Sequence, residues 1–199
     1  LEELWGSVRY DTGKLNMKSA GYGAPIEWHQ DWAFYPHTND DLAAVGIMID
    51  DATPENGPML MLPGSHEGPV HDHQANGYFV GGIDTVKAGI DCSGAQNCLG
   101  KAGSITIHHV RMVHGSAMNT SAQPRRFLLL QYRAADAWPL ILPPMNFSEY
   151  SALLVSGDET REPRMVACPV RIPHPPPPHL GSIYENQREL ENRYFARGE

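Results

Sequence analysis

The chain has 199 residues, of which 41% are hydrophobic, and it carries a formal net charge of -8. This hydrophobic content is enough for one domain with a packed core and argues against a disordered chain. Because the chain is acidic and has no cluster of lysine or arginine residues, no nucleic-acid partner is expected. No apolar run approaches the roughly 20 residues that a membrane-spanning helix needs, so no membrane association is expected either.

The start of the chain and its cysteines bear on where the protein works. The sequence begins at Leu1, without an initiator Met, and enters patterned sequence almost at once. We therefore expect N-terminal residues to be missing, so the absence of a targeting signal from this sequence says little about the intact protein. Three cysteines, Cys92, Cys98 and Cys168, are too few for a disulfide framework. The cytoplasm or another reducing intracellular compartment is the expected location.

Short apolar runs separated by turn residues dominate the middle of the chain. The strands predicted in chain order are Leu42–Asp50, Met59–Pro63, Gly103–His109, Val113–Asn119 and Arg125–Arg133. Between the second and third strands lies a long polar loop, residues 64–102, of a length that is usually functional or mobile. Glycine (19 residues) and proline (17 residues) are plentiful, as in turn-rich β proteins. The pattern predicts an antiparallel sandwich or barrel.

Helical patterns are confined to the C-terminal part of the chain. We predict short helices at Asn146–Val155, with Ser148 as the cap, and at Glu185–Phe195. The proline-rich stretch Ile172–Leu180 is expected to be extended and to strap the last helix onto the domain.

These elements predict a single domain over residues 1–199. Its barrel core is expected at residues 14–133, and the proline-rich strap with the C-terminal helix at residues 172–199.

The stretch WHQDW, Trp28–Trp32, places a histidine and an aspartate two positions apart between two tryptophans. On a strand, residues i and i+2 point to the same side, so the side chains of His29 and Asp31 would point at one place. Alone, such a pair is more often a local hydrogen-bonded pair than a metal site. Joined by a second histidine from another strand, it becomes a facial triad that leaves three positions open on iron(II).

Several histidines come into question as the second imidazole ligand. Besides His29 they are His37, His66, His71, His73, His108, His109, His114, His174 and His179. The pair at positions 71 and 73 has the spacing of two ligands but no strand signal around it. Only His114 opens a strand with a distinctive continuation, HGSAMNTSAQPRRF.

That continuation contains groups suited to a dicarboxylate cosubstrate. Such a molecule would chelate iron at one end and need a cation for its distal carboxylate, which arginine binds best through paired hydrogen bonds. The strand that follows begins with Arg125 and Arg126, and alternation lets only one of them point inward. Ser116 shares a face with His114 and could give a hydroxyl to the same carboxylate.

Three motifs in this order, WHQDW, ENGPMLMLPGSH and HGSAMNTSAQPRRF, resemble the phytanoyl-CoA dioxygenase family of Fe(II)/2-oxoglutarate oxygenases. The resemblance covers most of residues 14–133. It implies a mainly β fold, the double-stranded β-helix or cupin-like jelly-roll barrel, with a few flanking helices. By this resemblance the iron ligands and catalytic residues are His29, Asp31 and His114.

The resemblance also implies residues that bind 2-oxoglutarate. Arg125, eleven residues past the distal histidine, takes the cosubstrate carboxylate, and Ser116 contacts the cosubstrate as well. The stretch LNMKSAGYGAPIEWHQD resembles the corresponding segment of ectoine hydroxylases and places Asn16 near the cosubstrate. Gln30 is a further candidate contact, although alternation directs its side chain away from the metal.

The function implied by the resemblance is a dioxygenase that uses Fe(II), 2-oxoglutarate and O2. It would hydroxylate a small or medium organic metabolite and release succinate and CO2. Halogenating relatives lack the carboxylate ligand, so Asp31 favours hydroxylation. Two alternatives stay open: a cupin-like metalloenzyme that uses no keto acid, which leaves Arg125 without a role, and a non-catalytic barrel that binds a small ligand.

Overall fold

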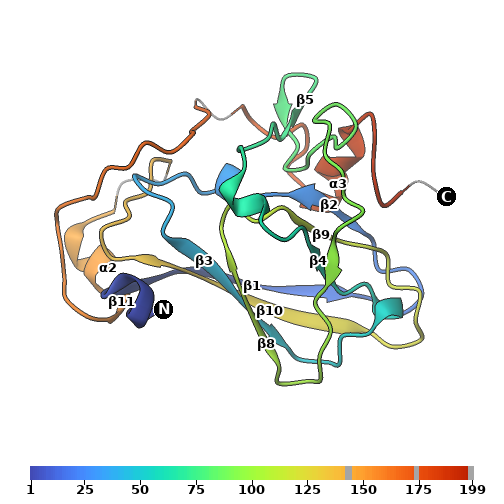
Figure 1. The fold of residues 1–199 in the computed structure, drawn as a ribbon, viewed down its shortest axis with the longest axis horizontal. Helices are drawn as coiled ribbons and strands as arrows, with labels where there is room; N and C mark the ends of the chain where they lie inside the picture. The colour runs from blue at the N-terminus through green and yellow to red at the C-terminus, as the bar shows by residue number, and fades with distance from the viewer. Residues whose placement is uncertain (142–144, 173–174, 197–199) are drawn as a thin grey trace.

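Two antiparallel sheets make up most of the fold, and Figure 1 shows the smaller sheet above the larger one. The computed structural model of the chain describes residues 1–141, 145–172 and 175–196. The larger sheet has the order β11 (Leu154–Ser156), β1 (Val8–Lys18), β10 (Arg125–Ala134), β3 (Leu42–Met48) and β8 (Ile105–His109). The smaller sheet has the order β2 (Ile26–His29), β9 (His114–Ser116), β4 (Met59–Met61) and β7 (Gln96–Asn97).

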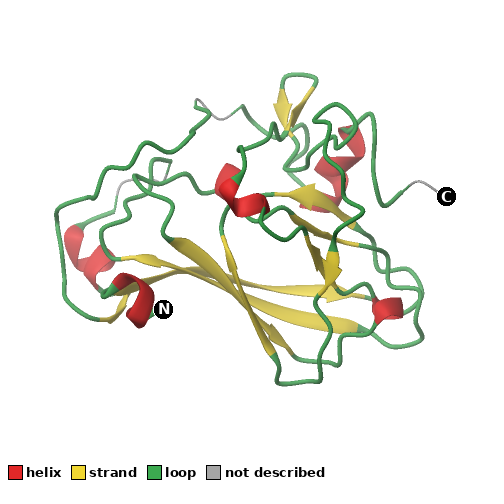
Figure 2. Cartoon of the chain, viewed as in Figure 1, coloured by secondary structure: helices red, strands yellow, loops and turns green. Residues whose placement is uncertain are grey.

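Helices are short, and Figure 2 shows them around the sheets. They are α1 (Glu2–Trp5), α2 (Phe147–Ser151), α3 (Ile183–Asn186) and the 3-10 turns η1 (Asp31–Ala33), η2 (Pro54–Asn56), η3 (Ser65–Glu67) and η4 (Gln187–Glu189). The longest of these in the part of the chain that the structure describes has five residues, so none of them could cross a membrane.

The central strand β10 confirms the alternation expected from the sequence. It pairs with β1 on one side and β3 on the other. Arg125, Phe127, Leu129 and Gln131 are buried, whereas Arg126 is exposed. The buried side chains of β10 point toward the smaller sheet.

All five strands predicted for the middle of the chain are present. Most of them are a few residues shorter than predicted.

One core cluster fills the space between the two sheets. Phe127 and Leu129 of β10 pack there with Ala44 and Met48 of β3 and with Met59 of β4. A second cluster packs Trp28 of β2 against residues of the long loop, including Ile83 and Cys92. The loop also contains the hairpin of β5 (Gln74–Ala75) and β6 (Tyr78–Phe79).

Both helix predictions need correction. The C-terminal helix does not run over Glu185–Phe195: it begins two residues earlier, at Ile183, and its α-helical and 3-10 turns end at Glu189. Beyond this point Tyr194 and Phe195 pack against Trp28, and tertiary contact overrides helix propensity.

The helix expected at Asn146–Val155 is α2, which ends at Ser151 and is followed by strand β11. Its cap is Asn146 rather than Ser148, because the Asn146 side chain accepts a hydrogen bond from the backbone N–H of Glu149. The proline-rich stretch Ile172–Leu180 includes residues 173–174, which lie outside the described residues.

Candidate active site

The first two candidate ligands come from the end of β2 and the turn after it. His29 is the last residue of β2 and Asp31 is the first of η1, so the expectation that both lie on one strand is wrong. Gln30 between them keeps an extended backbone, with φ -121° and ψ 127°, and this preserves the shared direction of the two side chains. His29 Nε2 lies 3.8 Å from Asp31 Oδ1.

The third candidate ligand comes from β9, the antiparallel neighbour of β2. His114 lies opposite His29 in the strand register, and the two ring centroids are 4.1 Å apart. His114 Nε2 lies 3.9 Å from Asp31 Oδ1. One donor atom from each of the three residues therefore lies within 4.8 Å of the other two.

Hydrogen bonds fix which nitrogen of each ring faces Asp31. Nδ1 of His29 lies 2.9 Å from the carbonyl oxygen of Glu27, and Nδ1 of His114 lies 2.9 Å from that of Met112. Because a carbonyl oxygen only accepts, each Nδ1 donates its proton to it, and Nε2 is the nitrogen of each ring that faces Asp31. Contacts of this kind orient metal-binding imidazoles in proteins.

The charge states of the site suit a metal ion. Burial lowers the pKa of His29 well below its ordinary value, so this ring is neutral near pH 7. Burial alone would raise the pKa of Asp31, but His114 and Lys14 are the strongest of the neighbours that lower it to about 2. Neutral imidazole and ionised carboxylate are the metal-binding forms of these groups. Two nitrogens and one oxygen suit iron(II) and leave coordination positions open.

Two residues that the sequence did not reveal lie beside the second oxygen of Asp31. Gln131 on β10 donates a 3.1 Å hydrogen bond from Nε2 to Asp31 Oδ2. His108 on β8 lies with Nε2 3.9 Å from the same oxygen, and its ring centroid is 4.7 Å from that of His114. Neither ring nitrogen of His108 has a hydrogen-bond partner among the described residues. Alternation put Gln131 on the inward face, but no sequence signal connected it with Asp31.

Arg125 enters the same cavity from β10. It is only 4% exposed, and its guanidinium donates to the carbonyl oxygen of Gly57 from Nε (3.2 Å) and Nη2 (2.5 Å). Burial lowers its pKa to about 10, which leaves it charged near pH 7. In the described part of the chain no carboxylate forms an ion pair with it. Arg126 instead pairs with Asp50 at the surface, at 2.6 and 2.9 Å.

The triad and Arg125 line one cavity of about 500 Å³, a volume that includes its open mouth. Ser116 and Asn16, both expected near the cosubstrate, line it as well. The complete lining is Lys14, Asn16, Ile26, His29, Asp31, Met59, His114, Gly115, Ser116, Arg125, Phe127, Leu129 and Ile183. Six of the seven residues singled out in the sequence are thus brought together.

Gln30 is the exception. Its side-chain Nε2 donates to the carbonyl oxygens of Pro69 (3.0 Å) and Arg111 (2.9 Å), and its Oε1 accepts from the backbone N–H of His71. The residue is buried and does not line the cavity. It ties β2 to the long loop, so we withdraw it as a cosubstrate contact. The alternation that keeps its neighbours together directs Gln30 to the opposite side.

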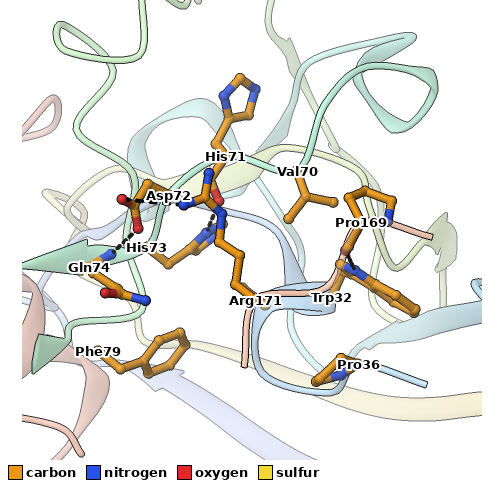
Figure 3. A pocket seen from close by; sticks show the side chains of 11 residues that line it. Trp32, Pro36, Val70, His71, Asp72, His73, Gln74, Phe79, Pro169 and Arg171 are labelled. Carbon is orange, nitrogen blue, oxygen red and sulfur yellow. Dashed lines mark hydrogen bonds and ion pairs between the residues drawn. The ribbon is translucent and has the colours of Figure 1, made fainter. Parts of the chain in front are cut away.

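Figure 3 shows a second hollow, lined by Trp32, Asp72 and Arg171 among others. Trp32 Nε1 donates to the carbonyl oxygen of Pro169 at 2.8 Å, and Arg171 Nη1 lies 3.6 Å from Asp72 Oδ2. The side chains of Trp32, Asp72 and Arg171 are thus already paired. None of the three candidate metal ligands lines it, so the triad cavity remains the candidate active site.

Comparison with known proteins places this site in a family. Residues 1–127 match the family described as phytanoyl-CoA dioxygenase (PhyH). The chain belongs to the phytanoyl-CoA dioxygenase family. The resemblance inferred from the three motifs is therefore confirmed.

Two curated relatives are similar to this PhyH-family chain. The probable alpha-ketoglutarate-dependent hypophosphite dioxygenase of Stutzerimonas stutzeri is 45% identical over 196 residues, which cover 96% of this chain and 68% of the relative. The L-proline trans-4-hydroxylase of Streptomyces griseoviridis is 33% identical over 180 residues, covering 79% of this chain and 67% of the relative. Both names describe oxygenation of a small molecule.

A solved structure that is similar to this chain was determined with 2-oxoglutarate bound. EvdO2 of Micromonospora carbonacea var. aurantiaca, complexed with 2-oxoglutarate, aligns with a TM-score of 0.52 and 28% identity. The alignment covers 69% of this chain and 56% of that chain, so the PhyH-family chain spans less than two thirds of the solved relative. The jelly-roll fold is confirmed. The names of these relatives indicate 2-oxoglutarate as the cosubstrate, and the donor set of two imidazoles and one carboxylate suits Fe(II).

Proposed function

We propose that the chain is an Fe(II)- and 2-oxoglutarate-dependent dioxygenase that hydroxylates a small molecule and releases succinate and CO2. The observation that carries this proposal is the meeting of two features in one cavity. The His29, Asp31 and His114 donors converge there, and a buried arginine, Arg125, lies beside them without an acidic partner among the described residues. A buried cation without a counter-charge is costly, so the site calls for an anionic ligand.

The proposed roles follow from the chemistry of each group. His29, Asp31 and His114 hold the metal, and Arg125 binds the distal carboxylate of 2-oxoglutarate. Ser116 and Asn16 supply further polar contacts to the cosubstrate. When bound, iron(II) and 2-oxoglutarate would react with O2 to provide the oxidant, which would replace a hydrogen of the substrate with a hydroxyl group. The cavity orients the reacting groups and limits access of water to them.

The substrate is proposed to be a small molecule rather than a large one. The relative at 45% identity is named for hypophosphite and that at 33% identity for L-proline. Hypophosphite is therefore the first compound to test, with L-proline as the organic counterpart. This extends the expectation of an organic metabolite to an inorganic oxyanion, whose oxidation would convert a P–H bond into P–OH.

The same proposal includes a reducing intracellular location. Cys92, Cys98 and Cys168 are all free thiols in the structure. Free cysteines persist in reducing compartments, which is the location expected from the sequence.

The test is anaerobic loading followed by turnover. Adding Fe(II) and then 2-oxoglutarate should give the visible charge-transfer absorption of a ferrous keto-acid chelate, and O2 should then yield succinate. Asp31→Ala should abolish both signals, and Asp51→Ala, whose carboxylate pairs with Lys101 outside the cavity, should change neither. Tight iron binding without the absorption or succinate would support a cupin-like protein that uses no keto acid, and would refute the proposal.

A further inference from the structure

Lys14 contributes a further charged side chain to the wall of the triad cavity. It lies on β1 directly opposite Leu129 of β10, so its side chain belongs to the row that faces the smaller sheet. The residue is exposed although it lines the cavity, which places it at the mouth. Within the described residues, no hydrogen bond or ion pair holds its ammonium group.

Lys14 shares its cavity with the triad. Its side chain lines the same hollow as His29, Asp31 and His114. A substrate that Lys14 holds would therefore lie in the cavity that contains the proposed metal position.

Lys18 lies four residues after Lys14 on the same inward face of β1, but it cannot take this role. It is 1% exposed, and its Nζ donates to the carbonyl oxygens of Ala24 (2.7 Å), Ala117 (2.6 Å) and Ser116 (3.4 Å). Its amino group is thereby already engaged by backbone carbonyls. Burial, with Arg125 nearby, lowers the pKa of Lys18 to about 6. Lys14 is thus the lysine of this row that is free to bind a ligand.

The charges of the loaded cavity leave one positive charge unbalanced. Of the lining residues, Asp31 is negative, while Lys14 and Arg125 are positive. The two charges of Fe(II) and those of 2-oxoglutarate cancel one another. The remaining charge of +1 is complementary to a substrate with a single negative charge, which it would attract into the cavity.

The rest of the wall indicates a small ligand with little other polarity. Its apolar members are Ile26, Met59, Phe127, Leu129 and Ile183. The polar side chains besides the triad and the two cations are Asn16 and Ser116, which the cosubstrate is proposed to use. A large substrate with many hydrogen-bonding groups would leave those groups unsatisfied against such a wall.

We propose that Lys14 binds the substrate of this enzyme, and that the substrate is a small, singly charged oxyanion such as hypophosphite or a short carboxylate. The inference rests on the proposed function, since it assumes that 2-oxoglutarate occupies Arg125. It assigns Lys14 to substrate specificity and not to the cosubstrate.

The experiment separates the two ligands of the cavity. Protein loaded anaerobically with Fe(II) and 2-oxoglutarate is titrated with hypophosphite, acetate and neutral acetamide, and binding is followed by the change in the charge-transfer absorption. The variants are Lys14→Met and Lys14→Arg, with Lys87→Met as a control far from the cavity. Affinity for 2-oxoglutarate is measured separately for each variant. The hypophosphite and acetate arms distinguish a phosphorus oxyanion from a carboxylate.

We expect at least one of the two anions to bind saturably and acetamide not to bind. Lys14→Met should weaken the anion about 10- to 100-fold, the range for a hydrogen bond to a charged group, and leave 2-oxoglutarate affinity unchanged. Lys14→Arg should restore most of the binding because it keeps the charge. Loss of 2-oxoglutarate binding in Lys14→Met, equal anion binding in both proteins, or binding of neither anion would overturn the inference. Absence of the charge-transfer absorption from the unmodified protein would instead refute the proposed function.

Discussion

Gln131 donates its hydrogen bond to Oδ2 of Asp31, the carboxylate oxygen that does not face the two histidines, while Oδ1 lies 3.8 and 3.9 Å from their Nε2 atoms. The amide thereby fixes the rotation of the carboxylate and directs one oxygen at the proposed metal position. Asp31 lies on a short turn, whereas Gln131 lies on the central strand of the larger sheet. The central strand β10 thus orients the carboxylate of Asp31 on the turn η1.

Gln131→Met should therefore weaken iron binding. The change keeps the length of the side chain and removes the donor, so Asp31 is free to rotate. Loss of such an outer contact typically costs about 10- to 100-fold in metal affinity. Anaerobic Fe(II) titration measures the effect, and Gln123→Met, at an exposed turn, is the matched control. Unchanged iron affinity in Gln131→Met would show that Asp31 is oriented by other contacts.

Arg125→Ala and Arg126→Ala should differ sharply, although the residues are neighbours. Arg125 is buried in the cavity, whereas Arg126 pairs with Asp50 outside it. Removing the buried cation should raise the 2-oxoglutarate concentration needed for the charge-transfer absorption by about 100-fold, because a paired charge-assisted contact is lost. Arg126→Ala should leave that concentration unchanged. Similar effects of the two changes would mean that the cosubstrate does not lie against Arg125.

Gly57 should be less tolerant of substitution than Gly64. Both have positive φ, 70° and 79°, but a Cβ at Gly57 would lie 2.6 Å from the carbonyl oxygen of Ala117, and one at Gly64 would meet nothing within 4 Å. Gly64→Ala should lower the free energy of unfolding by only about 1 kcal/mol, the cost of the left-handed conformation.

Gly57→Ala should cost more than that and should also weaken 2-oxoglutarate binding, because the Gly57 carbonyl holds Arg125. Denaturant unfolding and cosubstrate titration measure the two effects. Equal stability losses in the two variants would show that the contact around Gly57 relaxes freely.

The stability of the fold should decrease in mild acid. Burial lowers the pKa of His73 from 6.5 to about 4, because Nε2 accepts from the backbone N–H of Gln30 and the ring is enclosed. Between these pH values the unfolded chain binds a proton that the folded chain excludes, so stability is present above pH 6.5 and is lost as the pH falls. By pH 5 the loss from this residue is about 2 kcal/mol.

Urea unfolding at a series of pH values measures this slope. His73→Gln should flatten it between pH 6.5 and pH 4. If His73→Gln kept the full slope, the proton uptake would have to come from other buried histidines such as His37.

The sequence predicted those parts of the site that depend on local order. Strand alternation on β10 correctly separated Arg125 from Arg126, because side chains on a pleated strand alternate whatever lies beyond it. The spacing of His29 and Asp31 also gave a shared direction, even though the strand ends between them, since Gln30 stays extended.

The parts that depend on tertiary contacts could not be predicted. Gln131 and His108 reach Asp31 only because two sheets pack face to face, and no spacing in the chain encodes that approach. The prediction of a helix over Glu185–Phe195 was wrong for a similar reason. The backbone N–H groups of Tyr194 and Phe195 donate to the carboxylate of Glu27, which holds this segment out of a helix.

The most direct test of the proposed centre is a crystal structure with Fe(II) and 2-oxoglutarate under anaerobic conditions, with data collected at the iron absorption edge. We expect one anomalous peak, about 2.0–2.2 Å from Nε2 of His29, Oδ1 of Asp31 and Nε2 of His114, as is usual for such ligands. The distal carboxylate of 2-oxoglutarate should contact Arg125. An iron peak elsewhere, or one bound by fewer than these three side chains, would contradict the assignment.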